Sequence, residues 1–295
     1  MSKEKILVTS IEGNTQLLDG GSMFGNAPRP LWERWVNVDS IGRIELACRS
    51  LLVKYNGLNI LLEAGIGQFF EPKLADRYGV TPNDRHLLNE NLMAAGVSPE
   101  EIHFVILSHL HFDHIGGIVP GYEEFLKEKK LLFSNATFIT SKTAYERAMS
   151  PHPRDKASYI PDIIDLLIPG KNLLLIDENN DFPSDIKEIF SYRISHGHTP
   201  GQLLTSVHGS KKNITFCGDL VPGVPWVHLP ITMGYDRYPE LLIDEKKDLY
   251  QSLNLENDLL FYTHDISVCA SNVKLNEKNK YEAHDKKQTL LNYEL

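Results

Sequence analysis

The chain has 295 residues and a formal net charge of −9, from 30 Lys and Arg against 39 Asp and Glu. This acidic balance argues against a nucleic-acid-binding surface, which needs clustered basic side chains. Hydrophobic residues make up 42% and charged residues 23% of the chain, which is typical of globular rather than disordered proteins. No apolar run approaches the ~20 residues needed to cross a bilayer.

The sequence also carries signals about its compartment. The apolar stretch near its start is too short for a secretory signal peptide. Cys48, Cys217 and Cys269 stand singly along the chain and do not form a disulfide framework. We therefore expect a cytoplasmic protein.

Strand-like and helical patterns alternate along the chain, which predicts an α/β fold. Short β-branched or aromatic runs bounded by turn residues predict strands at residues 5–9, 50–55, 59–62, 103–107, 136–140, 172–176, 189–194, 203–207, 214–217 and 259–263. Helical periodicity falls at residues 84–95, 122–128, 143–149, 160–167 and 240–253. Ser98, Pro99 and Glu101 predict a short capped turn before the strand that follows.

Residues 12–49 differ from the rest because they are rich in Gly and Pro and hold Phe24, Trp32 and Trp35. Long aromatic loops in compact domains often form lids over a site. Trp side chains are also buried in most proteins, so these rings can equally serve to pack the loop onto the body. The pattern leaves both interpretations open.

The most informative string is residues 108–114, Ser-His-Leu-His-Phe-Asp-His, which follows an apolar strand. His109 and His111 are two positions apart, so they point the same way in extended chain, while Asp113 and His114 follow in the turn. Burying so many titratable groups without a cation is costly. The spacing therefore predicts a metal site with two adjacent cation positions.

This string resembles the His-x-His-x-Asp-His signature of the metallo-β-lactamase superfamily, and three further motifs extend the resemblance over nearly the whole chain. His198 stands in Gly-His-Thr-Pro-Gly, Asp219 follows one strand, and His264 follows another. The resemblance implies a four-layer αββα sandwich. It also implies one domain over residues 1–295, made of two αβ halves.

The resemblance assigns the ligands to two divalent cations. It implies His109, His111 and His198 on the first, Asp113, His114 and His264 on the second, and Asp219 between them. A set of His and Asp ligands suits Zn²⁺ first, and Fe and Mn also accept it. Where the family has an Asp before a small residue and Gly, this chain has Glu63, which we expect to orient the ligand loop.

Three other histidines compete for these roles. His196 lacks the Thr-Pro-Gly turn, so we expect it to support a ligand or lie on the surface. His284 has Lys and Glu neighbours, which predicts a solvated tail. His228 follows Asp219 by nine residues, so lining the pocket and supporting a ligand both stay open for it.

The resemblance implies a hydrolase. Two cations ~3.5 to 4 Å apart can hold a bridging hydroxide at neutral pH, and Asp113 is the implied proton carrier to the leaving oxygen. Residues 19–25 and 233–236 resemble the branch of quorum-quenching N-acyl-homoserine lactonases and organophosphate hydrolases. We therefore expect the opening of a small-molecule lactone.

The substrate pocket is marked by apolar and aromatic side chains. The candidates for its wall are Met23, Phe24, Trp32, Trp35, Trp226, His228 and Tyr235. Some lactonases of the superfamily carry a Tyr three residues after the bridging Asp, where this chain has Pro222, so Tyr235 is the candidate to replace it. Plain packing is the alternative role for the aromatic and Met residues.

Other activities stay open at this point. A phosphotriesterase and a thioesterase like hydroxyacylglutathione hydrolase would use the same hydroxide. A mononuclear iron persulfide dioxygenase and a non-catalytic metal-binding module are alternatives of other classes, and the complete set of seven ligands disfavours both. We expect no nucleic-acid or membrane partner, and the apolar loop on an acidic chain favours a homodimer.

Overall fold

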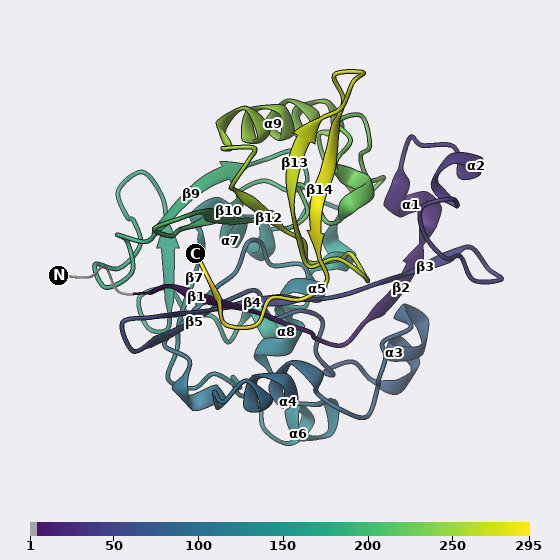
Figure 1. Ribbon diagram of the computed structural model, residues 1–295. Coiled ribbons are helices and arrows are strands. Elements are labelled where there is room, and N and C mark those ends of the chain that lie inside the picture. The colour runs from purple at the N-terminus through teal and green to yellow at the C-terminus, as the bar shows by residue number, and fades with distance from the viewer. Residues whose placement is uncertain (1–4) are drawn as a thin grey trace.

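The computed structural model describes residues 5–295. Two large β-sheets lie face to face between two layers of helices (Figure 1). On one side the helices are α4 (Leu87–Ala94), α6 (Tyr122–Lys127) and α8 (Pro161–Ile164), and on the other side α9 (Pro239–Ser252). This arrangement confirms the expected αββα sandwich.

The first sheet has seven strands in the order β15-β1-β4-β5-β6-β7-β8. They are β1 (Leu7–Ile11), β4 (Ser50–Tyr55), β5 (Leu58–Leu62), β6 (Phe104–Ile106), β7 (Thr137–Ser141), β8 (Leu173–Ile176) and β15 (Tyr293–Glu294). Side chains alternate along each strand, so in β4 Leu51 and Val53 enter the core between the sheets and Leu52 enters the core under the helices. Burial on both faces explains why such strands appear as continuous apolar runs.

The second sheet has six strands in the order β14-β13-β12-β11-β10-β9. They are β9 (Phe190–Ser195), β10 (Gln202–His208), β11 (Asn213–Phe216), β12 (Leu259–Phe261), β13 (Ala270–Leu275) and β14 (Tyr281–Lys287). The core between the sheets includes Val207, Phe216 and Phe261 from this sheet. Strands β11 and β12 pair in parallel, and β9 runs in the same direction as β11 because β10 is antiparallel to both.

Residues 12–49 form a two-stranded ribbon with two short helices rather than a long loop. Strand β2 (Gln16–Asp19) pairs with β3 (Arg43–Leu46), and α1 (Gly20–Phe24) and α2 (Arg29–Trp32) lie between them. We call residues 12–49 the N-terminal ribbon. Gly20 has a packing role here, since an added Cβ would lie 2.6 Å from the Trp32 ring.

The remaining helices are short. They are α3 (Pro72–Tyr78), α5 (Phe112–Ile115) and α7 (Lys142–Met149), with 3-10 turns η1 (Pro99–Glu101), η2 (Gly116–Ile118), η3 (Lys156–Ser158) and η4 (Val224–Val227). The predicted capped turn is confirmed, because Glu101 accepts a hydrogen bond from the Ser98 N–H. None of the helices within residues 5–295 combines the length and apolarity that a membrane crossing requires.

Two predicted elements need correction. The first strand spans Leu7–Ile11 rather than residues 5–9, because these are the residues that pair with β4. The expected solvated tail around His284 is instead strand β14, which pairs with β13 through backbone hydrogen bonds. Its side chains are mostly polar and exposed, so the sequence shows no apolar alternation that would predict a strand.

Candidate metal centre

The loops after strands β6, β9, β11 and β12 come together at one edge of the sandwich, where both sheets end. Parallel strands present their carboxyl ends at the same edge, so ligands far apart in sequence come together there. These loops and α5 carry the predicted ligands His109, His111, Asp113, His114, His198, Asp219 and His264, all of them buried. The ligand atoms form three groups whose members lie within 4.8 Å of one another.

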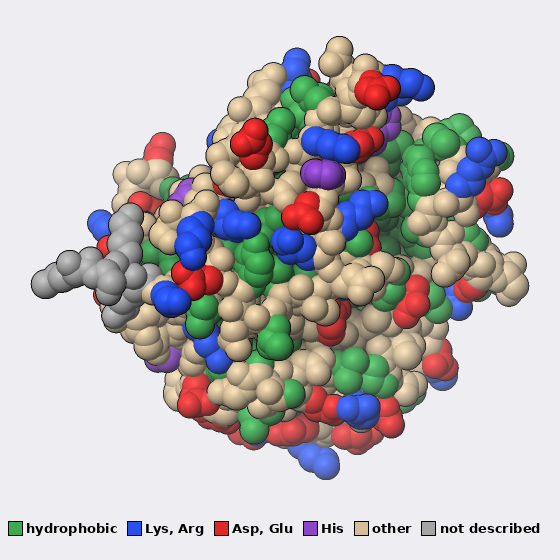
Figure 2. Space-filling view, in the orientation of Figure 1, with side chains coloured by type: hydrophobic (Ala, Val, Ile, Leu, Met, Phe, Trp, Pro, Cys, Tyr) green, Lys and Arg blue, Asp and Glu red, His purple; other side chains and the backbone are tan. Residues whose placement is uncertain are grey.

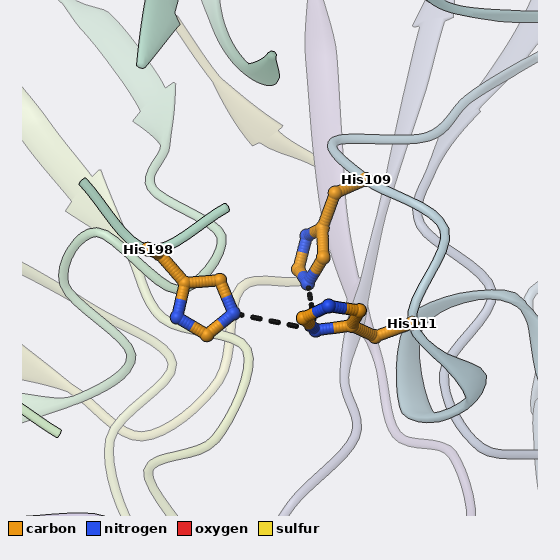
Figure 3. A group of neighbouring side chains, drawn as sticks. All are labelled: His109, His111 and His198. Atoms are coloured by element: carbon orange, nitrogen blue, oxygen red, sulfur yellow. Dashed lines mark hydrogen bonds between the residues drawn. The ribbon is translucent and has the colours of Figure 1, made fainter. Parts of the chain in front are cut away.

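The first group is His109, His111 and His198 (Figure 3). His111 Nδ1 lies 3.0 Å from His109 Nε2 and 3.3 Å from His198 Nε2. A single N–H on His111 cannot serve both neighbours. Three ring nitrogens that turn toward one another in this way suit a shared cation.

The second group is Asp113, His114 and His264, and Asp219 reaches both groups. One Asp219 oxygen lies 3.4 Å from His114 Nε2 and 3.2 Å from His264 Nε2. The other oxygen lies 3.3 Å from His198 Nε2. The carboxylate therefore lies between the two groups, as a bridging ligand would.

Each of four ligand rings is held through its other nitrogen. His114 Nδ1 lies 2.7 Å from Glu63 Oε2, and His198 Nδ1 lies 2.9 Å from Asp236 Oδ1. His264 Nδ1 donates to the Ala47 carbonyl at 2.7 Å, and His109 Nδ1 lies 2.9 Å from the Ser108 hydroxyl. Such anchors fix the orientation and the tautomer of a metal-binding imidazole.

Glu63 occupies the position where the family has an Asp, and its backbone is left-handed with φ 67°. It is fully buried, accepts a hydrogen bond from the Ser108 N–H and contacts His114 with its other oxygen. The longer side chain thus contacts both the ligand loop and a ligand. From this position the Glu63 carboxylate can hold both groups in place.

The anchors show that the donor set fits a cation. The Ala47 carbonyl can only accept, so neutral His264 carries its proton on Nδ1 and turns the Nε2 lone pair toward Asp219. A lone pair that faces a carboxylate is repelled unless a cation or a proton lies between them. The buried His114 Nε2 and Asp219 Oδ1 also have no hydrogen-bond partner within residues 5–295. Imidazole nitrogens and carboxylate oxygens in this arrangement are the ligands of a divalent metal ion.

The protonation of the cluster supports the same conclusion. Burial lowers the pKa of His109 and His111 well below the usual range, and the neighbouring imidazoles add to this effect. Burial alone would raise the pKa of Asp219, but the imidazoles of His114, His264 and His198 outweigh it and hold that pKa well below its usual range. Burial also lowers the pKa of His114, His198 and His264, but the Asp219 charge outweighs it and raises the pKa of all three. The ionised carboxylate therefore collects positive charge around it, which is the charge that a bound cation would supply.

Two residues of the site were not predicted. Gln16 on β2 donates from Nε2 to Asp113 Oδ2 at 2.6 Å, and both side chains are buried. Asp236 holds His198 and also accepts from the Met233 N–H. Gln16 is the first residue of a short strand that also ends in a polar residue, Asp19, so its own surroundings carried no signal for this role. For Asp236 the sequence offered only its position within residues 233–236, one of the segments that carry the family resemblance.

A cavity of about 220 Å³ opens onto the cluster. We call it the reaction pocket. Met23, Phe112, Tyr235 and Arg154 line it together with ligand residues that include Asp113 and Asp219. Met23 and Tyr235 therefore lie where the sequence predicted pocket residues.

The aromatic candidates divide between two locations. Trp35, Trp226 and His228 line a separate, larger cavity beside the reaction pocket. Phe24 and Trp32 line neither, so the expectation that they form the pocket wall is wrong. Phe24 is stacked between Trp32 and Trp226, with ring centroids 5.4 and 4.6 Å apart, and this stack packs the N-terminal ribbon onto the body.

The competing histidines lie outside the cluster. His196 is exposed, and its Nδ1 accepts from the Gly201 N–H at the turn that follows His198. His284 is exposed on β14. The structure therefore brings together the seven predicted ligands and leaves these histidines apart from them.

Known proteins resemble this chain in sequence. The sequence model of the Metallo-beta-lactamase superfamily matches residues 43–264. An N-acyl homoserine lactonase from Bacillus thuringiensis is 25% identical over 208 residues, which cover 68% of this chain and 69% of that protein. An N-acyl homoserine lactonase from Rhizobium radiobacter is 29% identical over 41% of this chain and 43% of its own length.

Solved structures share the fold over nearly the whole chain. A probable metal-dependent hydrolase from Staphylococcus aureus has a TM-score of 0.81 at 22% identity, and the match covers 97% of this chain and 99% of that one. A dizinc quorum-quenching lactonase has a TM-score of 0.73 at 21% identity, with 96% and 95% covered. At these identities the likeness establishes the fold.

Proposed function

The chain belongs to the metallo-beta-lactamase superfamily, and on this premise we propose that it is a dinuclear metal-dependent hydrolase that opens lactones such as N-acyl homoserine lactones. The observation that carries the proposal is the Asp219 carboxylate between two groups of histidines in a buried cluster. The similarity to N-acyl homoserine lactonases over about two thirds of the chain supports the choice of substrate.

In this proposal the first cation binds His109, His111 and His198, and the second binds His114, His264 and Asp113, with Asp219 shared. Zn²⁺ suits these ligands best, and Fe or Mn can replace it. When bound, the cations supply a water activated at neutral pH and Lewis-acid polarisation of the scissile carbonyl.

The side chains of the pocket have two tasks in the proposed reaction. Water gives up a proton as its oxygen adds to the acyl carbon, the ring C–O bond breaks, and the leaving alkoxide takes that proton. Asp113 lines the reaction pocket and is the proposed carrier of that proton. Burial raises the pKa of Tyr235, so its phenol stays protonated and can donate a hydrogen bond to the substrate carbonyl.

Proton release from a panel of substrates tests the proposal. The purified, Zn-loaded chain is incubated in weak buffer with a pH indicator and, separately, with an N-acyl homoserine lactone, a glutathione thioester, a phosphotriester and a phosphodiester. We expect acidification with the lactone above all. Turnover of the thioester or phosphotriester alone would replace the lactonase assignment, and no turnover of any of them would contradict a hydrolase of these classes.

A further inference from the structure

One arginine lies inside the fold instead of on its surface. Figure 2 shows Lys and Arg side chains spread over the surface of the molecule, among acidic ones. Arg49, between β3 and β4, is only 2% exposed and is among the largest fully buried side chains of residues 5–295. A charged side chain is rarely buried unless it is paired and hydrogen-bonded, because it must leave water. Its guanidinium group must therefore have partners inside the fold.

The partners of Arg49 include carbonyl groups of the segment that carries His264. Nη1 of Arg49 donates to the Tyr262 carbonyl at 3.1 Å and to the Asp265 carbonyl at 2.9 Å. Both carbonyls belong to the loop that follows β12, and we call residues 262–268 the His264 loop. The guanidinium group therefore joins two points of this loop, one on each side of His264 in the chain.

The backbone beside Arg49 fixes His264 itself. The Arg49 N–H donates to the Thr263 carbonyl at 3.0 Å, and the Thr263 hydroxyl donates to the Arg49 carbonyl at 3.2 Å. The Ala47 N–H donates to the His264 carbonyl at 3.2 Å, and His264 Nδ1 donates to the Ala47 carbonyl at 2.7 Å. The His264 ring thus keeps its orientation only while these two stretches of backbone stay together.

The hydrogen bonds to the carbonyls are what Arg49 contributes to this region. Its Nε also donates to Glu12 Oε1, but the Glu12 side chain is 42% exposed, and an ion pair with an exposed carboxylate contributes little. Without the guanidinium group, the carbonyls of Tyr262 and Asp265 would lose this donor in a mostly buried region. A buried carbonyl that loses its donor is destabilised. The His264 loop would then turn these carbonyls toward water.

The two cation positions differ in where their anchors come from. The side chains that anchor His109 and His198 are at positions 108 and 236, outside the N-terminal ribbon. Two anchors of the second group, Gln16 and the Ala47 carbonyl, lie within the ribbon. Arg49 is the last residue of the ribbon and binds it to the His264 loop. Its loss should therefore affect the second cation more than the first.

We propose that Arg49 is a positioning residue, which holds the His264 loop against the N-terminal ribbon and thereby turns His264 Nε2 toward the second cation. This inference rests on the proposed function, because it concerns the second cation of the same centre. It adds a requirement for a planar group with several donors at position 49. Lys is a poor replacement, because its ammonium group lacks this planar fork of N–H donors.

Stepwise Zn²⁺ binding tests the role of Arg49. Competition with a chelator gives the first and second dissociation constants of the wild type, Arg49→Lys and Arg49→Ala, and circular dichroism checks their folding. We expect both variants to weaken the second Zn²⁺ by ~10- to 100-fold relative to the first, as the loss of an outer partner typically does. If the second Zn²⁺ binds to both variants as tightly, relative to the first, as it does to the wild type, the inference is wrong.

Two control variants distinguish positioning from general stability. Arg43→Met removes another arginine of the ribbon, one that pairs with Asp39, so it should leave both dissociation constants unchanged. Leu92→Ala removes a buried side chain from α4 and should lower Tm without changing the ratio of the two constants. If Leu92→Ala weakens the second Zn²⁺ as much as the Arg49 variants do, the effect is one of stability and the inference is overturned.

A measurement on the metal-free chain separates this inference from the dinuclear proposal. The Nδ1–H of His264, held by the Ala47 carbonyl, should give a slowly exchanging side-chain signal in nitrogen-edited NMR spectra. We expect this signal in the wild type and Arg43→Met and its loss in Arg49→Ala, or in Arg49→Lys if the Ala variant does not fold.

The two measurements have different consequences. If the signal persists in the Arg49 variants and they bind the second Zn²⁺ normally, the inference fails and the dinuclear proposal stands. If the wild type binds only one Zn²⁺, the dinuclear proposal fails, and the signal of His264 still decides whether Arg49 positions this ring.

Discussion

Individual ligands in this cluster depend on one hydrogen bond each for their orientation. Asp113 is held by Gln16, which comes from a strand 97 residues earlier in the chain. The oxygen that accepts from Gln16 lies 3.6 Å from His264 Nε2, and the other oxygen lies 3.8 Å from His114 Nε2. The amide of Gln16 thus holds the carboxylate against both histidines of the second group. Gln16 is therefore a positioning residue for the second cation.

Replacing Gln16 with Leu should weaken the binding of the second cation. The variant keeps the side-chain volume but leaves Asp113 Oδ2 without its donor, and loss of such an outer partner typically lowers metal affinity by ~10- to 100-fold. Metal content after dialysis against a weak chelator, measured by elemental analysis, should fall selectively for the second site. Gln251→Leu on the exposed face of α9 is the control. Equal retention of metal by the two variants would contradict the role of Gln16.

Replacing His109 with Ala should abolish hydrolysis and leave the fold intact. His109 is a proposed ligand of the first cation, so its loss removes the activated water, which is worth many orders of magnitude in rate. Turnover is measured beside circular dichroism and metal content. His196→Ala is the matched control, because His196 is exposed and outside the cluster. A His109 variant as active as the control would remove the ligand assignment.

At the level of elements, α9 links the second sheet to the loop that carries His228. Leu242, Leu249 and Tyr250 are buried on its inner face. Lys246 lies among them, and its Nζ donates to the carbonyls of Ile231 at 2.9 Å and His228 at 3.2 Å. Burial lowers the pKa of Lys246 to about 7. This helix therefore buries a titrating group near neutral pH.

Lys246 should give the protein a measurable rise in stability with pH. Between the folded pKa of about 7 and the ordinary value near 10.4, the unfolded chain binds more protons than the folded one. The free energy of unfolding therefore rises with pH in this window, by about 1 kcal/mol per pH unit. Urea unfolding at pH 7, 8 and 9 should show this slope in the wild type and in Lys247→Met, and a flatter one in Lys246→Met. Equal slopes in the wild type and both variants would show that Lys246 does not titrate in this pH range.

On the scale of the whole molecule, the metal centre joins the two halves of the sandwich. His109, His111, Asp113 and His114 follow a strand of the first sheet, whereas His198, Asp219 and His264 follow strands of the second. A cation bound by both sets holds the sheets together at this edge. Without a cation the buried carboxylates and imidazoles remain desolvated and incompletely paired.

Metal removal should therefore destabilise the entire fold. A cation present at about 1,000 times its dissociation constant contributes ~4 kcal/mol, so stripping the protein with dipicolinate should lower Tm by at least about 5 °C. Added Zn²⁺ should restore the original Tm in scanning calorimetry. Elemental analysis must first confirm that the metal has been removed. If Tm is then unchanged, the cluster does not connect the two halves.

The convergence of the candidate ligands and the sandwich fold were predictable because their signals are local. The residues around His109, His198, Asp219 and His264 each combine an apolar strand with a ligand just after its end. Strand ends of an α/β sheet converge in any such fold, so local motifs sufficed to place distant ligands together. The same reasoning failed for β14, whose strand conformation is set by its pairing with β13 and not by apolar residues of its own.

By itself, the amino-acid sequence determined which residues are the candidate metal ligands and which strands they follow, since spacing and strand periodicity are properties of short segments. Only the tertiary structure decided that Gln16 holds Asp113, that Asp236 and the Ala47 carbonyl orient their histidines, and that Phe24 and Trp32 pack inside the ribbon. These contacts join residues far apart in the chain, and which of them form depends on how whole layers pack against one another.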